Sequence, residues 1–190
     1  MKDNLKIILG SKSPRRRELL TQMGYKFSTE PIEIDEAVAS YENVRDYVRQ
    51  IAARKGRIIS QKHPDDLVIC ADTIVALGET IFEKPKDQED ARRMIKALAG
   101  RSHDVFTAVF LKLEEQEKTF IVRTRVEIDS MTDDEIEAYV STDEPYDKAG
   151  AYAIQGQFGK YIKGIRGDYY NVMGLPICRL HREIEKFFGE

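Results

Sequence analysis

Residues 67–77 of the chain read Leu-Val-Ile-Cys-Ala-Asp-Thr-Ile-Val-Ala-Leu. A run this rich in β-branched and other apolar residues predicts a strand at the centre of a sheet. Asp72 interrupts the run, and a carboxylate in a buried strand is costly unless it is paired, hydrogen-bonded or bound to a metal ion. Asp72 is therefore a candidate general base or metal ligand, with a structural aspartate that caps a turn as the alternative.

Strand and helix patterns alternate on both sides of this run. Ser13-Pro14 and the Thr-Asp-Asp-Glu sequence at 132–135 mark helix starts, and Gly24 and Gly100 mark helix ends. The patterns predict strands over 5–9, 25–34, 67–77, 80–82, 105–113 and 119–128, and helices over 13–24, 44–60, 87–98, 132–141 and 176–188. The last two strands would form a hairpin. These elements predict an α/β or mixed α+β fold with a mixed sheet, in one domain over 1–190 because no linker or repeat interrupts them.

Composition narrows the class of protein. The chain has 190 residues, 42% of them hydrophobic and 33% charged, with a formal net charge of -3. These values are typical of a globular protein and give no basis for non-specific nucleic-acid binding. The apolar stretch at 5–9 is too short for a signal peptide or a membrane span, and no later stretch is long enough either. With two isolated cysteines, which we interpret as reduced and buried, we expect a cytoplasmic protein that does not bind membranes.

A basic segment follows the first predicted strand. Residues 10–17 read Gly-Ser-Lys-Ser-Pro-Arg-Arg-Arg, where a strand passes into a helix. A helix N-terminus favours an anion. Arginines in its first turn are unfavourable because they oppose the helix dipole, so their presence there indicates a compensating function. Binding of a phosphate chain is such a function, so Ser11, Arg15 and Arg16 are candidate phosphate ligands. A solvated basic turn is the alternative, and the segment is not a Walker A loop.

Three further segments carry candidate functional residues. Glu33, Asp35 and Glu36 form an acidic cluster that suits Mg²⁺, although an acidic strand end in solvent would have the same sequence. Lys84 precedes Pro85, which holds the backbone there in a defined position. The glycine-rich segments 147–156 and 167–176 suggest close backbone approach to a ligand, or an ordinary tight loop. Within the first, the amide of Gln155 could recognise the edge of a nucleobase.

Together these segments resemble the Maf family of nucleoside triphosphate pyrophosphatases. The resemblance runs in order through 11–16, 71–73, 83–85, 98–103, 147–156 and 167–176, and so covers nearly the whole chain. It implies a fold like that of inosine triphosphate pyrophosphatases, with a long mixed β-sheet flanked by helices and two lobes around a central cleft. It also implies a homodimer and dependence on a divalent metal cation, Mg²⁺ or Mn²⁺.

The resemblance also implies roles for individual residues. Asp72 corresponds to the proton acceptor, and Glu36 to a metal ligand or second acid; whether Asp72 is base or metal ligand stays open. Arg15, Lys55 and Lys84 would surround the triphosphate with Ser11 near them, although nothing in the sequence pattern alone singles out Lys55. The positions that select the nucleobase in the family correspond to Arg15, Thr73 and Gln155. These residues match the branch of the family that acts on dTTP and UTP rather than the branch that acts on 7-methyl-GTP.

Two alternative functions would use the same predicted phosphate-binding segment. A non-catalytic nucleotide-binding regulator of cell division would need the phosphate pocket but no general base, and it would release no pyrophosphate. A sugar-phosphate enzyme would use the helix N-terminus for one phosphate and would gain no affinity from a triphosphate. Direct binding of nucleic acid is the least favoured function, given the acidic balance of charge.

Overall fold

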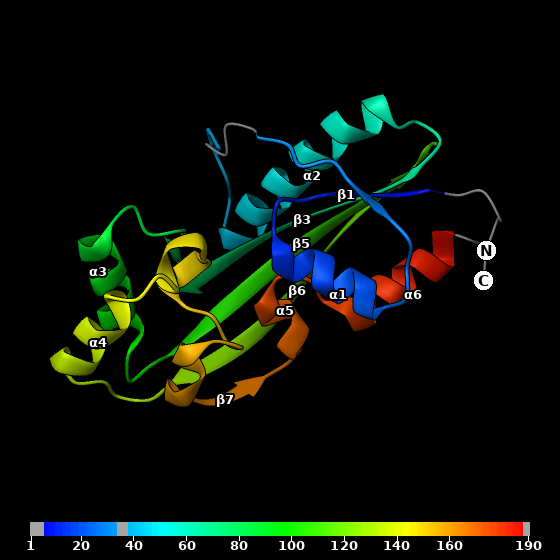
Figure 1. The fold of residues 1–190 in the computed structure, drawn as a ribbon. Helices are drawn as coiled ribbons and strands as arrows, with labels where there is room; N and C mark the ends of the chain where they lie inside the picture. The colour runs from blue at the N-terminus through cyan, green and yellow to red at the C-terminus, as the bar shows by residue number, and fades with distance from the viewer. Residues whose placement is uncertain (1–5, 34–37, 188–190) are drawn as a thin grey trace. The chain divides into compact units, whose positions relative to one another are not determined.

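The computed structural model describes residues 6–33 and 38–187 (Figure 1). Along the chain, the strands and longer helices are β1 Ile7–Gly10, α1 Pro14–Gln22, β2 Ser28–Thr29, α2 Val44–Lys62, β3 Leu67–Leu77, β4 Thr80–Phe82, α3 Gln88–Leu98, β5 Ser102–Leu113, β6 Gln116–Ile128, α4 Asp133–Val140, β7 Ile162–Arg166, α5 Tyr169–Met173 and α6 Ile177–Phe187. Three short 3-10 helices lie between α4 and β7: η1 Pro145–Asp147, η2 Ala149–Ala151 and η3 Gln157–Tyr161.

The strands form one mixed sheet in the order β2-β1-β3-β5-β6-β7, with β4 paired to β3. The strand β1 runs parallel to β2 and β3, with Leu9 opposite Ile69. The β3–β4 and β6–β7 pairs are antiparallel. A seven-stranded mixed sheet flanked by helices confirms the predicted fold class.

The chain divides into two compact units, and each has a core of its own. Unit 1 comprises residues 1–72, 107–122 and 174–190, and unit 2 comprises 73–106 and 123–173. The strands β3, β5 and β6 contribute residues to both. The cleft between two lobes that the resemblance implies stays a prediction.

In unit 1, helix α2 packs on the sheet. Asn43 caps it by accepting hydrogen bonds from the backbone N–H groups of Arg45 and Asp46. Its apolar face joins a buried cluster with residues of β1, β3 and β5: Ile8, Ala53, Ile59, Val68, Cys70 and Phe110. Figure 1 draws α2 above the strands of this unit and α1 and α6 below them.

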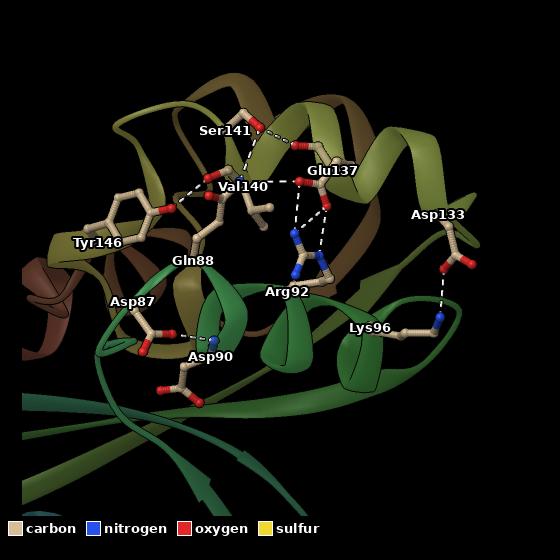
Figure 2. A network of polar contacts seen from close by, with 10 residues as sticks. All are labelled: Asp87, Gln88, Asp90, Arg92, Lys96, Asp133, Glu137, Val140, Ser141 and Tyr146. Carbon is tan, nitrogen blue, oxygen red and sulfur yellow. Dashed lines mark hydrogen bonds and ion pairs between the residues drawn. The ribbon is translucent and has the colours of Figure 1, made fainter.

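In unit 2, α3 and α4 share an apolar core, and surface ion pairs link the two helices above it (Figure 2). Arg92 forms a bidentate contact with Glu137, and Lys96 pairs with Asp133. Thr132 and Glu135 form the capping box that the sequence predicts at the start of α4. Exposed pairs contribute little stability, so the buried aromatic and aliphatic side chains beneath them determine how these helices pack.

Three elements differ from the sequence-based expectation. The strand predicted over 25–34 is reduced to Ser28–Thr29 within the described residues, because both are exposed at the sheet edge and Pro31 cannot donate to a ladder. The strand β7 and the helix α5 were not predicted. Alternation in β7 is weak because Lys163 and Gly164 break it, and its side chains are half-buried or exposed, so its pairing with β6 defines it.

Candidate active site

A largely buried ion pair lies in unit 1. The ammonium group of Lys55, on α2, donates a hydrogen bond of 2.7 Å to Oδ1 of Asp72, on β3. The two side chains are 11% and 12% exposed. Because a lone charge at such a site would carry a large desolvation cost, each group accounts for the other's burial. The structure therefore brings together two residues to which the resemblance assigns catalytic roles.

The loop between β1 and α1 presents the predicted phosphate-binding segment. Ser13 is the N-cap of α1, with Pro14 at the first helical position, as the sequence predicts. The Oγ atom of Ser11 accepts hydrogen bonds from the backbone N–H of Ser13 at 3.1 Å and from Nη1 of Arg16 at 3.3 Å. The loop is thus ordered by its own side chains at the positive end of a helix, which is a suitable place for an anion.

Arg16 connects this loop to a segment far along the chain. Its Nε atom donates a 2.8 Å hydrogen bond to the carbonyl oxygen of Gly174, which begins the C-terminal part of unit 1. Arg16 therefore ties together two of the segments that carry the family resemblance. Arg15, next to it, is half-buried.

The pKa of the Cys70 thiol is affected by two positive charges of this unit. Burial raises the pKa of its thiol to about 12, while the positive charges of Lys55 and Arg16 and a hydrogen bond with the Gly10 backbone act in the opposite direction. Lys55 and Arg16 therefore both lie within electrostatic range of one side chain. The thiol is protonated at neutral pH and is not a nucleophile. The interpretation of Cys70 as a buried thiol is confirmed. The same interpretation was wrong for Cys178, which is exposed because α6 buries the face that carries Leu180 and Ile184 instead.

Unit 2 holds the other candidates. Thr73 is half-buried on β3, Lys84 is exposed after β4, and Gln155 is exposed in the turn before η3. The backbone N–H of Gly150 donates a 3.0 Å hydrogen bond to the carbonyl oxygen of Glu83, so the segments that carry Lys84 and Gln155 are joined within this unit.

Gly150 also packs closely on β3. Its φ angle is +70°, and a Cβ at this position would lie 2.8 Å from Cγ2 of Val75. Glycine is required on both counts, which explains one of the small residues in the segment 147–156.

The acidic cluster lies mostly outside the described residues. Glu36 and Asp35 belong to 34–37, so their prediction as metal ligands is untested. Glu33 is exposed and forms an ion pair with Lys12, which lowers the pKa of its carboxyl group. Over the ranges 6–33 and 38–187, no three His, Cys, Asp or Glu side chains form a group that could hold a metal ion.

Several polar residues of unit 2 were not predicted: His103 and Asn171 are buried, and Glu144 is half-buried. Nε2 of His103 lies 2.7 Å from the hydroxyl oxygen of Tyr152. Asn171 donates hydrogen bonds to the carbonyl oxygen of Val105 and to Thr124. Glu144 accepts hydrogen bonds from the backbone of η3. The only signal in the sequence was their position in or beside the segments that carry the resemblance, because each contact joins residues distant along the chain.

A mixed α/β fold with a cationic strand–helix loop and a buried lysine–aspartate pair defines a protein class suited to phosphate ligands. The chain belongs to the family described as Maf-like protein, whose model matches residues 6–187. It is 42% identical over 182 residues, 96% of this chain and 95% of the relative, to a Bacillus cytotoxicus protein named dTTP/UTP pyrophosphatase. A Koribacter versatilis protein of the same name is 44% identical over 180 residues, 95% of this chain and 93% of that protein.

Two solved structures are similar over part of the chain. The Staphylococcus aureus Ham1 protein aligns with 65% of this chain and 71% of its own, at 13% identity and a TM-score of 0.47. A nucleoside triphosphatase, or dITP/XTP pyrophosphatase, of Mycobacterium abscessus aligns with 65% of this chain and 74% of its own, at 14% identity and a TM-score of 0.42. In the part of the chain that the structure describes, no helix combines the length and apolar content that crossing a membrane requires.

Proposed function

We propose that this chain is an enzyme that hydrolyses the pyrimidine nucleoside triphosphates dTTP and UTP to the monophosphate and pyrophosphate. Family membership and the names of relatives at 42% and 44% identity support the reaction class and the substrate. The observation that carries the proposal for this chain is the buried pair of Lys55 and Asp72, in the same unit as the loop that holds Ser11 and Arg16. A regulator without catalytic activity would need no general base.

In the proposed reaction, water attacks the α-phosphorus. A bond forms between the water oxygen and phosphorus, the bond between the α-phosphorus and the bridging oxygen breaks, and pyrophosphate leaves. Asp72 either takes the proton of the attacking water or holds the metal ion. The ammonium group of Lys55 orients the carboxylate through the 2.7 Å hydrogen bond. Together with Arg15 and Lys84, Lys55 stabilises the negative charge that develops on the leaving group.

The proposed cofactor is a divalent cation of the Mg²⁺ or Mn²⁺ type. Such ions take one or two protein carboxylates and complete their coordination with substrate phosphates and water. Asp72 is a buried carboxylate in the unit that also holds the basic loop, and Glu36 is the proposed second ligand. Bound there, the cation would neutralise phosphate charge and lower the pKa of the water.

Base choice is assigned to Arg15, Thr73 and Gln155. An exposed amide at Gln155 offers one acceptor and two donors, which suits the polar edge of a pyrimidine. Assembly as a homodimer and a cytoplasmic location accompany this proposal as expectations from the family.

A substrate panel with pyrophosphate detection tests the proposal. Under Mg²⁺, we expect pyrophosphate from dTTP and UTP at higher kcat/KM than from CTP, dATP or dGTP. Asp72→Asn should lower kcat about 10²–10⁴-fold. The matched control is Asp65→Asn, an exposed aspartate just before the same strand, which should keep full activity. Wild-type turnover in a folded Asp72→Asn variant would remove Asp72 from the mechanism, and equal efficiency with purines would refute the pyrimidine assignment.

A further inference from the structure

Glu144 holds the backbone that follows Gln155. Its Oε2 atom accepts a hydrogen bond of 2.7 Å from the backbone N–H of Gln157, and Oε1 accepts one of 3.2 Å from the N–H of Phe158. The Tyr139 hydroxyl donates a third, 3.1 Å long, to Oε1. A carboxylate is suited to this place because it has only acceptors, and all three neighbours are donors. All of these residues belong to unit 2.

Gly156 leaves the space that this carboxylate fills. A Cβ at Gly156 would lie 2.2 Å from Oε2 of Glu144 and 2.4 Å from its Cδ. The backbone of Gly156 has φ -101°, a conformation that other residues adopt, so the requirement for glycine here comes from the packing of Glu144. The two residues therefore fit each other although they lie far apart along the chain.

The hydrogen bonds of the Glu144 carboxylate to Gln157 and Phe158 replace a missing side-chain N-cap of η3. Gly156 is the N-cap of η3 and has no side chain to cap it, so Glu144 satisfies the first N–H groups of η3 from a distance. On the far side, Phe158 is fully buried and packs against the rings of Tyr139, Tyr152 and Tyr161. The turn that presents Gln155 is consequently fixed at its C-terminal end by both polar and aromatic contacts.

The main chain around Glu144 is also anchored. The ammonium group of Lys148 donates a 2.8 Å hydrogen bond to the carbonyl oxygen of Glu144. On the other side of the turn, the N–H of Gly156 donates to the carbonyl oxygen of Ala153 at 3.3 Å. Removing the carboxylate would therefore loosen the C-terminal end of the turn while leaving the backbone of residue 144 in place.

We propose that Glu144 is a positioning residue for nucleobase selection, which it achieves by fixing the turn that carries Gln155. The inference rests on the proposed function, since it assigns Gln155 to the base edge. The carboxylate of Glu144 accepts its hydrogen bonds from Tyr139, Gln157 and Phe158, so its proposed effect on the base acts through the turn. Its loss should weaken the binding of the correct base and spare the chemical step, because a recognition group displaced by a fraction of an ångström loses its directional hydrogen bonds.

Two variants disturb the contact in different ways. Glu144→Gln keeps the shape but replaces one acceptor oxygen with an NH₂ group, so one backbone N–H loses its partner. Gly156→Ala keeps the carboxylate but occupies its space. Glu137→Gln is the matched control, with the same chemical change on the exposed side of α4, where the carboxylate pairs with Arg92 (Figure 2).

The measurements are kcat and KM for dTTP and CTP, the Kd of α,β-imido-dUTP, and amide hydrogen exchange at Gln157 and Phe158. We expect both variants to raise KM and Kd about tenfold and to narrow the preference for dTTP over CTP, with kcat changed less than about threefold. Exchange at the two amides should become faster, and Glu137→Gln should match the wild type in every measurement.

The outcomes separate this inference from the proposed function. Unchanged Kd and base preference in folded variants with faster exchange would overturn the role of Glu144. Rapid exchange of both amides in the wild-type protein would overturn it without any variant. If the wild type bound α,β-imido-dUTP but released no pyrophosphate from dTTP, the proposed function would fail, while the Kd values would still decide the role of Glu144.

Discussion

The ammonium nitrogen of Lys55 lies 2.7 Å from Oδ1 of Asp72, and nearly nine-tenths of each side chain is buried. The pair joins α2 to β3 across 17 positions of sequence. Removing one member of a buried pair typically costs about 3–5 kcal/mol, because the other charge is left without compensation, whereas removing both can be nearly neutral. The pair thus combines a structural role with the catalytic roles proposed for its members.

Coupling between these residues can be measured in a double-mutant cycle. We expect Lys55→Met to lower the free energy of unfolding by about 3 kcal/mol, and Asp72→Asn by somewhat less because its amide keeps hydrogen-bonding capacity. The double variant should be more stable than the sum of the single losses predicts. Urea denaturation gives all four values, and strict additivity would mean that the two charges do not depend on each other.

Arg16→Lys tests the link between the basic loop and Gly174. Lysine cannot donate from an Nε–H position, so the 2.8 Å hydrogen bond to the Gly174 carbonyl would be lost. We expect the free energy of unfolding to fall by about 1.5–3 kcal/mol, since the bond has a charged donor, and the KM for dTTP to rise. The control is Arg17→Lys, at the exposed neighbouring position. Equal thermal stability and KM in the two variants would contradict this account.

Gly56→Ala should destabilise the protein although alanine favours helices. In an ordinary helix the change would add about 1 kcal/mol of stability. Here a Cβ would lie 2.0 Å from Cδ1 of Phe110, and overpacking of this kind typically costs about 1–3 kcal/mol. Denaturation of Gly56→Ala, Phe110→Leu and the double variant decides the matter. The double variant should recover part of the loss, and a stabilising Gly56→Ala would show that the ring can move aside at little cost.

The stability of unit 2 should fall in mild acid because of His103. The residue is 1% exposed, and burial lowers the pKa of its imidazole from 6.5 to about 4. Below pH 6.5 the unfolded chain binds a proton at His103 that the folded protein does not bind until the pH approaches 4. The contribution of neutral His103 to the free energy of unfolding is therefore complete above pH 6.5 and is lost as the pH falls towards 4. The difference amounts to roughly 3 kcal/mol.

The check compares the wild type with His103→Gln by urea denaturation between about pH 7.5 and 4, a range that spans both pKa values. Glutamine retains a donor near the hydroxyl group of Tyr152 but does not titrate. The wild type should lose more stability than the variant over this range, although other groups titrate in both proteins. Parallel pH curves would show that His103 is not responsible.

The sequence alone predicted that Asp72 is a buried carboxylate in need of a partner, because its charge interrupts an apolar run. The N-caps Ser13 and Thr132 and the hairpin of β5 and β6 were predictable for a similar reason, since each depends on residues close together along the chain. Lys55 carried no such signal, because a lysine on a helix is ordinary until its partner is known. Its place in the site came from the resemblance alone, and Glu144 was missed altogether.

Local patterns thus specified the individual helices, the buried strands and the acid that interrupts β3, because caps, periodicity and burial preference act over a few residues. The folded chain supplied the partners: Lys55 for Asp72, Gly174 for Arg16 at a separation of 158, and Glu144 for the turn after Gln155. Such contacts form only when the sheet order and helix packing bring distant segments together. For this reason Asp72 could be found from the sequence pattern, whereas the geometry of the candidate site was decided by the tertiary structure.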